Sequence, residues 1–256
     1  MSRVEDSLIS PYLLSVLFLA VAFAYSSVGL GGGSSYTALM AIAGVSTAAI
    51  PIISLTLNLL VTAVGSVNFF RSGHVRMRLL IPFLISSIPM SYLGGSLKLP
   101  KAMFYWILLA TLCFVALRIY VWEKTTIHLS IGKTAKLAVS LTTGSVLGLI
   151  AGIVGIGGGI YLVPLIIVLG LGSEKEAAAC GAIFILLNSL SGLIARLQFN
   201  SIDPSQIILP IVAVVIGSAS GSLMGAVKYR PQTIQKVLGA VILVAIVFLS
   251  RKVLMS

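Results

Sequence analysis

Residues 28–33 read Val-Gly-Leu-Gly-Gly-Gly, and residues 154–159 read Val-Gly-Ile-Gly-Gly-Gly. Each hexapeptide lies inside a long apolar segment, at about 11–43 and about 137–172. A helix rises about 1.5 Å per residue, so a straight helix over either segment would be roughly 50 Å long, whereas the hydrocarbon core of a bilayer is about 30 Å thick. Each glycine costs a helix about 1 kcal/mol. Both segments are therefore predicted to break at these glycines.

The composition places the two segments in a membrane. Hydrophobic residues make up 58% of the 256 residues and charged residues only 9%, compared with about 25% charged residues in a soluble domain. The apolar runs are continuous, which argues against the alternating strands of a β-barrel. We therefore predict an all-α, multi-pass protein of the cell membrane, with the lipid bilayer as its surroundings.

A membrane location also explains the net charge of +11. In a soluble protein it would suggest nucleic-acid binding. Here the basic residues fall in short loops between apolar runs, as the positive-inside rule requires. No nucleic-acid partner is predicted.

The chain also repeats. Asn58 and Asn188 each follow a leucine inside an apolar segment, and the Gly94–Pro100 spacing recurs at Gly225–Pro231. Each half is predicted to hold one glycine-broken segment followed by three transmembrane helices, with the halves at 1–121 and 137–256 and a basic cytoplasmic connector at 122–136. The six unbroken helices are expected at about 51–70, 79–97, 102–121, 177–199, 207–227 and 233–249.

Two topologies remain open for the broken segments. If both cross the membrane fully, the basic residues divide rather evenly between the two sides. If each forms a re-entrant hairpin, the asymmetry is larger, the halves are inverted, and Ser2 and Ser130 lie on opposite faces. The hairpin topology fits the positive-inside rule better, and inverted repeats with discontinuous helices are typical of secondary transporters. In this topology one side carries Arg71, Arg76, Arg78, Arg118, Lys124, Lys133, Lys136, Lys175, Lys228, Arg230 and Lys236, and the other carries Arg3, Lys98, Lys101, Arg251 and Lys252.

The glycine breaks are the predicted substrate site. Broken backbone at membrane depth is tolerated only where it is buried in protein or lines a cavity. A helix that restarts after a break presents free N–H groups and a positive dipole end, which bind anions. Scattered glycines such as Gly144, Gly148, Gly217 and Gly221 are instead interpreted as helix-packing positions. The candidate substrate-binding residues near the breaks are Gly31, Gly32, Gly33, Ser34, Tyr36, Gly157, Gly158, Gly159 and Tyr161.

Three further polar residues lie inside apolar segments. Asn58 and Asn188 are candidates for paired amide donors to the substrate, with interhelical hydrogen bonding as the alternative. Arg196 is a candidate counter-charge on an anion path, with snorkelling to the interface as the alternative. The apolar segments contain no carboxylate, so an anionic substrate fits better than a cation.

The second glycine motif also resembles a known family. Residues 152–164, Gly-Ile-Val-Gly-Ile-Gly-Gly-Gly-Ile-Tyr-Leu-Val-Pro, are similar to those of the sulfite exporter TauE/SafE family. The first motif departs from this pattern, because residues 34–37 read Ser-Ser-Tyr-Thr and no proline follows. The resemblance implies a multi-pass exporter of sulfur-containing anions, such as sulfite or organosulfonates.

Other functions fit less well. The sequence contains no HExxH motif, Ser/His/Asp set or Cys/His metal cluster, so neither an enzyme, a cofactor nor a bound metal is predicted. A passive anion channel is the main alternative to a carrier, and a membrane assembly factor is a weaker one. Neither the residues nor the resemblance indicates an oligomeric state.

Overall fold

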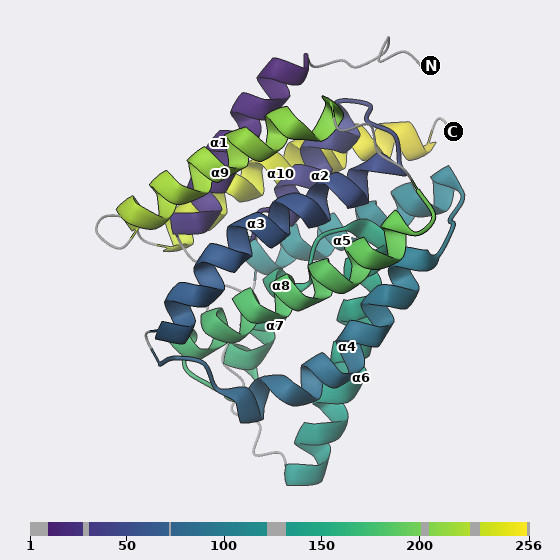
Figure 1. Ribbon diagram of the computed structural model, residues 1–256. Coiled ribbons are helices and arrows are strands. Elements are labelled where there is room, and N and C mark those ends of the chain that lie inside the picture. Colours follow the sequence, from purple (N-terminus) through teal and green to yellow (C-terminus); the bar gives the residue numbers. More distant parts are fainter. Residues whose placement is uncertain are drawn as a thin grey trace.

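The computed structural model describes residues 10–27, 31–71, 73–121, 132–200, 205–225 and 231–254, and these parts form ten α-helices (Figure 1). The predicted all-α fold is confirmed, and both long apolar segments are broken at their glycines. The helices of the first half are α1 (Pro11–Ser27), α2 (Gly33–Ile42), α3 (Ala49–Arg71), α4 (Met77–Ser96) and α5 (Lys101–Tyr120). Those of the second half are α6 (Lys133–Val154), α7 (Gly159–Val168), α8 (Glu174–Leu197), α9 (Ser205–Gly225) and α10 (Pro231–Leu254).

Helix α8 begins at Glu174, three residues before its predicted start at 177. Apolar character begins at Ala177, but a capping box starts the helix at Glu174. The Ser173 backbone N–H donates to Glu176 Oε2 at 2.8 Å, and the Glu176 N–H donates to Ser173 Oγ at 3.3 Å. Capping satisfies N–H groups that the first turn leaves free. Glu174 and Glu176, which precede the predicted start of this helix at 177, therefore lie in its first turn.

Glycines hold two helix pairs in close contact. On α6, three glycines one turn apart lie against backbone carbonyls of α4, at positions where a Cβ would overlap the carbonyl oxygen. The residue numbers of the α4 partners rise together with those of the α6 glycines, so the two helices run parallel. Two glycines of α9 lie in the same way on α1, which confirms the interpretation of these glycines as packing positions. The contacts are Gly144 on Phe83, Gly148 on Ser87, Gly152 on Ser91, Gly217 on Leu19 and Gly221 on Phe23.

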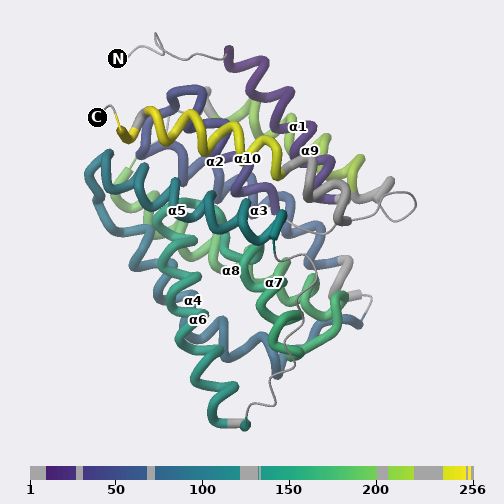
Figure 2. Tube along the Cα trace, turned by 180° about the vertical axis from the view of Figure 1, so that it is seen from behind, coloured from purple at the N-terminus to yellow at the C-terminus, as the bar shows by residue number. Residues whose placement is uncertain are grey.

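The surface is that of a membrane protein. Within the residues that the structure describes, five helices are long and apolar enough to span a bilayer, namely α3, α4, α5, α6 and α8. Large apolar side chains such as Ile85 and Trp106 are more than half exposed. In the tube view, α4 and α6 lie side by side away from the α1–α9 pair (Figure 2). The chain is a multi-pass membrane protein.

The loops divide between two faces. Arg76, before α4, forms an ion pair of 3.5 Å with Glu176 of α8, and one cavity brings Arg76, Lys136 and Leu171 together. The start of α6 and the end of α7 thus lie at the same face. At the other face, the Lys98 ammonium lies 5.6 Å from the centre of the Phe199 ring. This arrangement agrees with the hairpin topology for the second broken segment, while the inversion of the two halves stays a prediction.

Cysteine labelling tests this topology. Ser2 and Ser130 lie outside the described residues, whereas Lys98 and Ser173 are described and exposed. In a background with Cys113 and Cys180 replaced by alanine, Lys98→Cys and Ser173→Cys should react with a membrane-impermeant maleimide from opposite faces. A chain in which both broken segments cross fully places the two positions on the same face, and same-face labelling would refute the hairpin topology.

Candidate functional site

Asn58 lies where the two helix breaks meet. A Cβ built on Gly31 would lie 3.0 Å from Asn58 Oδ1, and one built on Gly157 would lie 3.2 Å from Asn58 Nδ2. A Cβ on Gly33 would overlap Asn58 Nδ2 and would lie 2.7 Å from the Ile156 carbonyl oxygen. The breaks are thus in direct contact, and glycine is required there because the neighbouring atoms fill the space of a side chain.

Ser54 joins the two breaks one turn before Asn58. Its Oγ lies 2.7 Å from the Gly155 carbonyl oxygen and 3.3 Å from that of Gly33. Asn58 Nδ2 donates to the same Gly155 oxygen at 3.3 Å. Ser54 was not predicted as a site residue, although its position four residues before Asn58, on the same helix face, was a usable signal.

Helix α8 contributes Ile185 and Ser189 to the site. A Cβ on Gly157 would lie 2.7 Å from Ile185 Cγ2 and 3.2 Å from Ser189 Oγ. Ile185 also lies against Gly31, so it contacts both breaks. Ile185 lies near the middle of α8, and Asn58 near the middle of α3. These positions correspond to the middle depth of a spanning helix.

The site offers hydrogen-bond donors and a positive potential. Helix α2 begins at Gly33 and α7 at Gly159, and neither start has a side-chain cap among the described residues. Their first N–H groups therefore lack intrahelical partners and carry the positive end of the helix dipole. Gly157 and Gly158 have φ values of +80° and +77°, a conformation that favours glycine.

Several buried polar atoms at and near the breaks have no partner among the described residues. Asn58 Oδ1, Ser189 Oγ and the Tyr36 hydroxyl are of this kind. Most buried polar atoms in proteins make at least one hydrogen bond, so each exception needs an explanation. A ligand bound between the breaks could accept a hydrogen bond from the Ser189 hydroxyl, whereas Asn58 Oδ1 only accepts hydrogen bonds and would need a donor.

Asn188 has different surroundings from Asn58. Its Nδ2 donates to Ser87 Oγ at 3.0 Å and to the Phe184 carbonyl at 2.8 Å, and its backbone carbonyl accepts from Ser91 Oγ at 2.8 Å. Its Oδ1 has no partner among the described residues, as for Asn58. The bond to Ser87 orients the Asn188 side chain toward α4. The two asparagines are equivalent in the repeat, yet Ser189, rather than Asn188, contacts Gly157.

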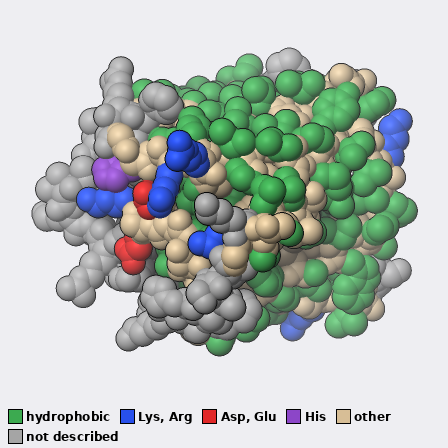
Figure 3. Space-filling view, turned by 90° about the horizontal axis from the view of Figure 1, so that it is seen from below, with side chains coloured by type: hydrophobic (Ala, Val, Ile, Leu, Met, Phe, Trp, Pro, Cys, Tyr) green, Lys and Arg blue, Asp and Glu red, His purple; other side chains and the backbone are tan. Residues whose placement is uncertain are grey.

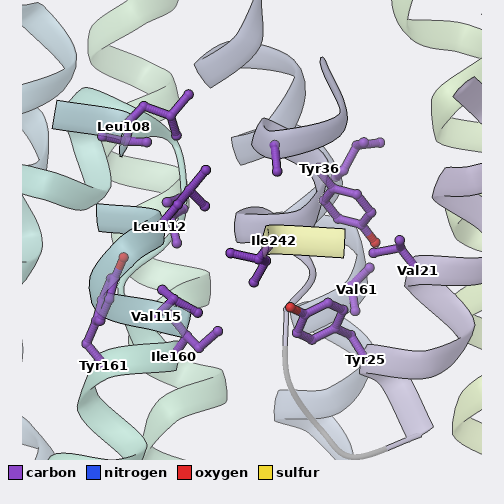
Figure 4. Close-up of a cluster of buried hydrophobic side chains, with 14 of the residues drawn as sticks. Val21, Tyr25, Tyr36, Val61, Leu108, Leu112, Val115, Ile160, Tyr161 and Ile242 are labelled. Atoms are coloured by element: carbon purple, nitrogen blue, oxygen red, sulfur yellow. The ribbon is translucent and has the colours of Figure 1, made fainter. Parts of the chain in front are cut away.

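The candidate tyrosines lie in the apolar core beside the breaks. In Figure 4, Tyr36 and Tyr25 lie on one side of a hydrophobic cluster and Tyr161 on the other. The Tyr161 hydroxyl donates to the Thr111 carbonyl at 3.2 Å. The Ser34 hydroxyl lies 3.1 Å from the Tyr25 hydroxyl. Tyr161 and Ser34 are therefore engaged within the protein.

Arg196 binds the end of the helix that precedes the second break. Its Nε and Nη2 donate to the Gly152 carbonyl at 3.1 and 3.0 Å, and Nη2 donates to the Ile153 carbonyl at 2.6 Å. The residue is only 7% exposed, so it does not snorkel to the interface. A cation at a helix C-terminus offsets the negative end of the dipole.

Replacing Arg196 should therefore destabilise the protein. Arg196→Leu would leave buried carbonyls of α6 without donors, and hydrogen bonds to charged groups contribute about 1.5–3 kcal/mol each. We expect a loss of about 3 kcal/mol in unfolding free energy, and a smaller loss for Arg196→Lys. Thermal unfolding in detergent measures both, with Lys101→Leu on the exposed start of α5 as the control. Equal melting temperatures for Arg196→Leu and the control would contradict a capping role.

These features define a multi-pass helical membrane protein with a buried polar site between two helix breaks. The model of the family described as sulfite exporter TauE/SafE matches residues 13–249. The chain belongs to this family and is a membrane transporter. It is 33% identical over 234 residues to the "Probable membrane transporter protein y4hK" of Sinorhizobium fredii (strain NBRC 101917 / NGR234), covering 91% of this chain and 95% of that protein. No solved structure matches the chain.

Proposed function

We propose that the protein is a secondary transporter that exports sulfur-containing anions, such as sulfite or organosulfonates, and binds them between the two helix breaks. One observation carries this proposal. Gly31 and Gly157, which precede the starts of α2 and α7, both lie against Asn58 and Ile185. Two uncapped helix starts thus flank one buried amide side chain.

The chemistry of this site suits an oxyanion. Sulfite and sulfonate oxygens accept hydrogen bonds from backbone N–H groups, amide N–H groups and hydroxyls, which the helix starts, Asn58 and Ser189 supply. No carboxylate of a described residue contacts these groups. Arg196 adds to the preference for anions, because it offsets the negative end of α6 directly before the break.

Substrate class and direction are inferred from the family, whose description names sulfite export. A carrier is favoured over a channel because the site is closely packed. Ile185 lies against both breaks, and Ser54 bridges them. Substrate passage then requires the breaks to separate and close again, as in alternating access.

Uptake into proteoliposomes tests the proposal. The panel contains labelled sulfite, sulfate and the organosulfonate methanesulfonate, with chloride, sodium and potassium for comparison. We expect saturable flux of one or more sulfur-containing anions, and accumulation above the outside concentration when an ion gradient is imposed. Anion flux that never exceeds equilibrium would favour the channel. Selective sodium or potassium flux that is insensitive to sulfur anions would refute the proposal.

A further inference from the structure

A second polar site lies at the starts of α4 and α6, at the opposite end of these helices from the breaks. A cavity of about 280 Å³ opens there between the two helix starts and the end of α7. Arg76, Arg78 and Lys136 line it, together with the apolar side chains of Leu79 and Leu137. Figure 3, which views the molecule from below, shows charged side chains gathered on one part of this face.

The positive charge of this cavity is only partly balanced. Arg76 forms an ion pair of 3.5 Å with Glu176. Arg78 and Lys136 form no ion pair with a residue that the structure describes. Two exposed cations therefore border the cavity without a described acidic partner.

The helix dipoles add to this potential. Helices α4 and α6 run parallel, so their starts lie together, and neither has a side-chain cap among the described residues. Cations are favourable at helix C-termini and unfavourable at N-termini. The positive-inside rule accounts for basic residues near the ends of these helices. The structure adds that three of them line one cavity between two helix starts without side-chain caps. A bound anion would offset both the side-chain charges and the dipoles.

We propose that this cavity binds an oxyanion group, either a free sulfur oxyanion or phosphate, or the phosphate of an anionic lipid. Arginine and lysine are the common donors to such groups. Leu79, Leu137 and Leu171 supply an apolar wall that would suit a lipid chain as well. This inference does not depend on the proposed transport function, because the cavity shares no residue with the site between the breaks.

The test uses the double variant Arg78→Gln/Lys136→Gln and the matched control Lys98→Gln/Lys101→Gln, which removes two exposed cations from the opposite face. The shift in melting temperature is titrated with sulfite and with phosphate at constant ionic strength in detergent. Phosphatidylglycerol binding is measured by native mass spectrometry against phosphatidylcholine. Size-exclusion profiles confirm that both variants are folded.

We expect at least tenfold weaker binding in the double variant and wild-type binding in the control. Loss of phosphatidylglycerol binding alone identifies the lipid as the source, and loss of the sulfite or phosphate response alone identifies the free anion. Repeating the titration in Asn58→Leu separates this cavity from the site between the breaks, since the cavity should bind normally there even if transport fails. Wild-type affinity of the double variant for all three probes would overturn the inference.

Discussion

Transport by Gly33→Ala is expected to fall at least tenfold relative to the wild-type protein. The new methyl group would overlap Asn58 Nδ2 and lie 2.7 Å from the Ile156 carbonyl oxygen. The carbonyl is backbone and cannot rotate away, so the two breaks must move apart at the contact where the substrate is proposed to bind. A tenfold loss corresponds to about 1.4 kcal/mol. Initial rates of sulfite or organosulfonate uptake, normalised to folded protein, measure the effect.

Gly65→Ala is the matched control for this variant. Gly65 lies in α3, and a Cβ there would have no heavy atom within 4 Å. Because alanine favours a helix over glycine by about 1 kcal/mol, this variant should transport normally and unfold no more easily. Wild-type transport by Gly33→Ala would show that contact between the breaks is not needed for transport.

The breaks were predictable from the sequence because they follow from the length of the apolar segments and the glycines within them. An apolar segment longer than the bilayer is thick, with adjacent glycines inside it, leaves few alternatives to a discontinuous helix. The boundaries of the six unbroken helices agree with expectation within five residues, the largest difference being the end of α10 at Leu254 rather than 249. The earlier start of α8 has a local cause, the capping box at Ser173. Packing glycines such as Gly148 and Gly217 were predictable from their type and spacing.

The contents of the site were less predictable, because they depend on which face of each helix meets the breaks. Repeat equivalence selected Asn188, but the rotation of α8 places Ser189 and Ile185 against Gly157. Arg196 was recognised as unusual from its charge, yet its partners, the carbonyls of Gly152 and Ile153, lie more than forty positions away in the chain. Contacts between distant segments are fixed by packing and leave no local pattern in the sequence.

The different surroundings of the two asparagines lead to a second large expected effect. Asn58→Leu should weaken substrate affinity at least tenfold, about 1.4 kcal/mol, because it removes an amide that lies against both breaks. Asn188→Leu removes hydrogen bonds to Ser87 and to the Phe184 carbonyl. A hydrogen bond between membrane helices averages about 0.6 kcal/mol and reaches about 1.7 at most. Asn188→Leu should therefore lower stability by about that amount and leave substrate affinity nearly unchanged.

Concentration dependence of uptake and thermal unfolding, measured on the same preparations, separate these two roles. Leucine keeps the branching of asparagine but replaces the amide with two bulkier methyl groups, so thermal unfolding of each variant shows whether packing has changed. A change in affinity without a change in melting temperature reports a lost substrate contact. If both variants lose affinity to the same degree, the asparagines act as the equivalent pair that the repeat predicts, and Asn188 must turn from α4 toward the substrate during transport. If Asn58→Leu retains wild-type affinity, the buried amide between the breaks serves packing alone, and the anion must bind elsewhere along the helix starts.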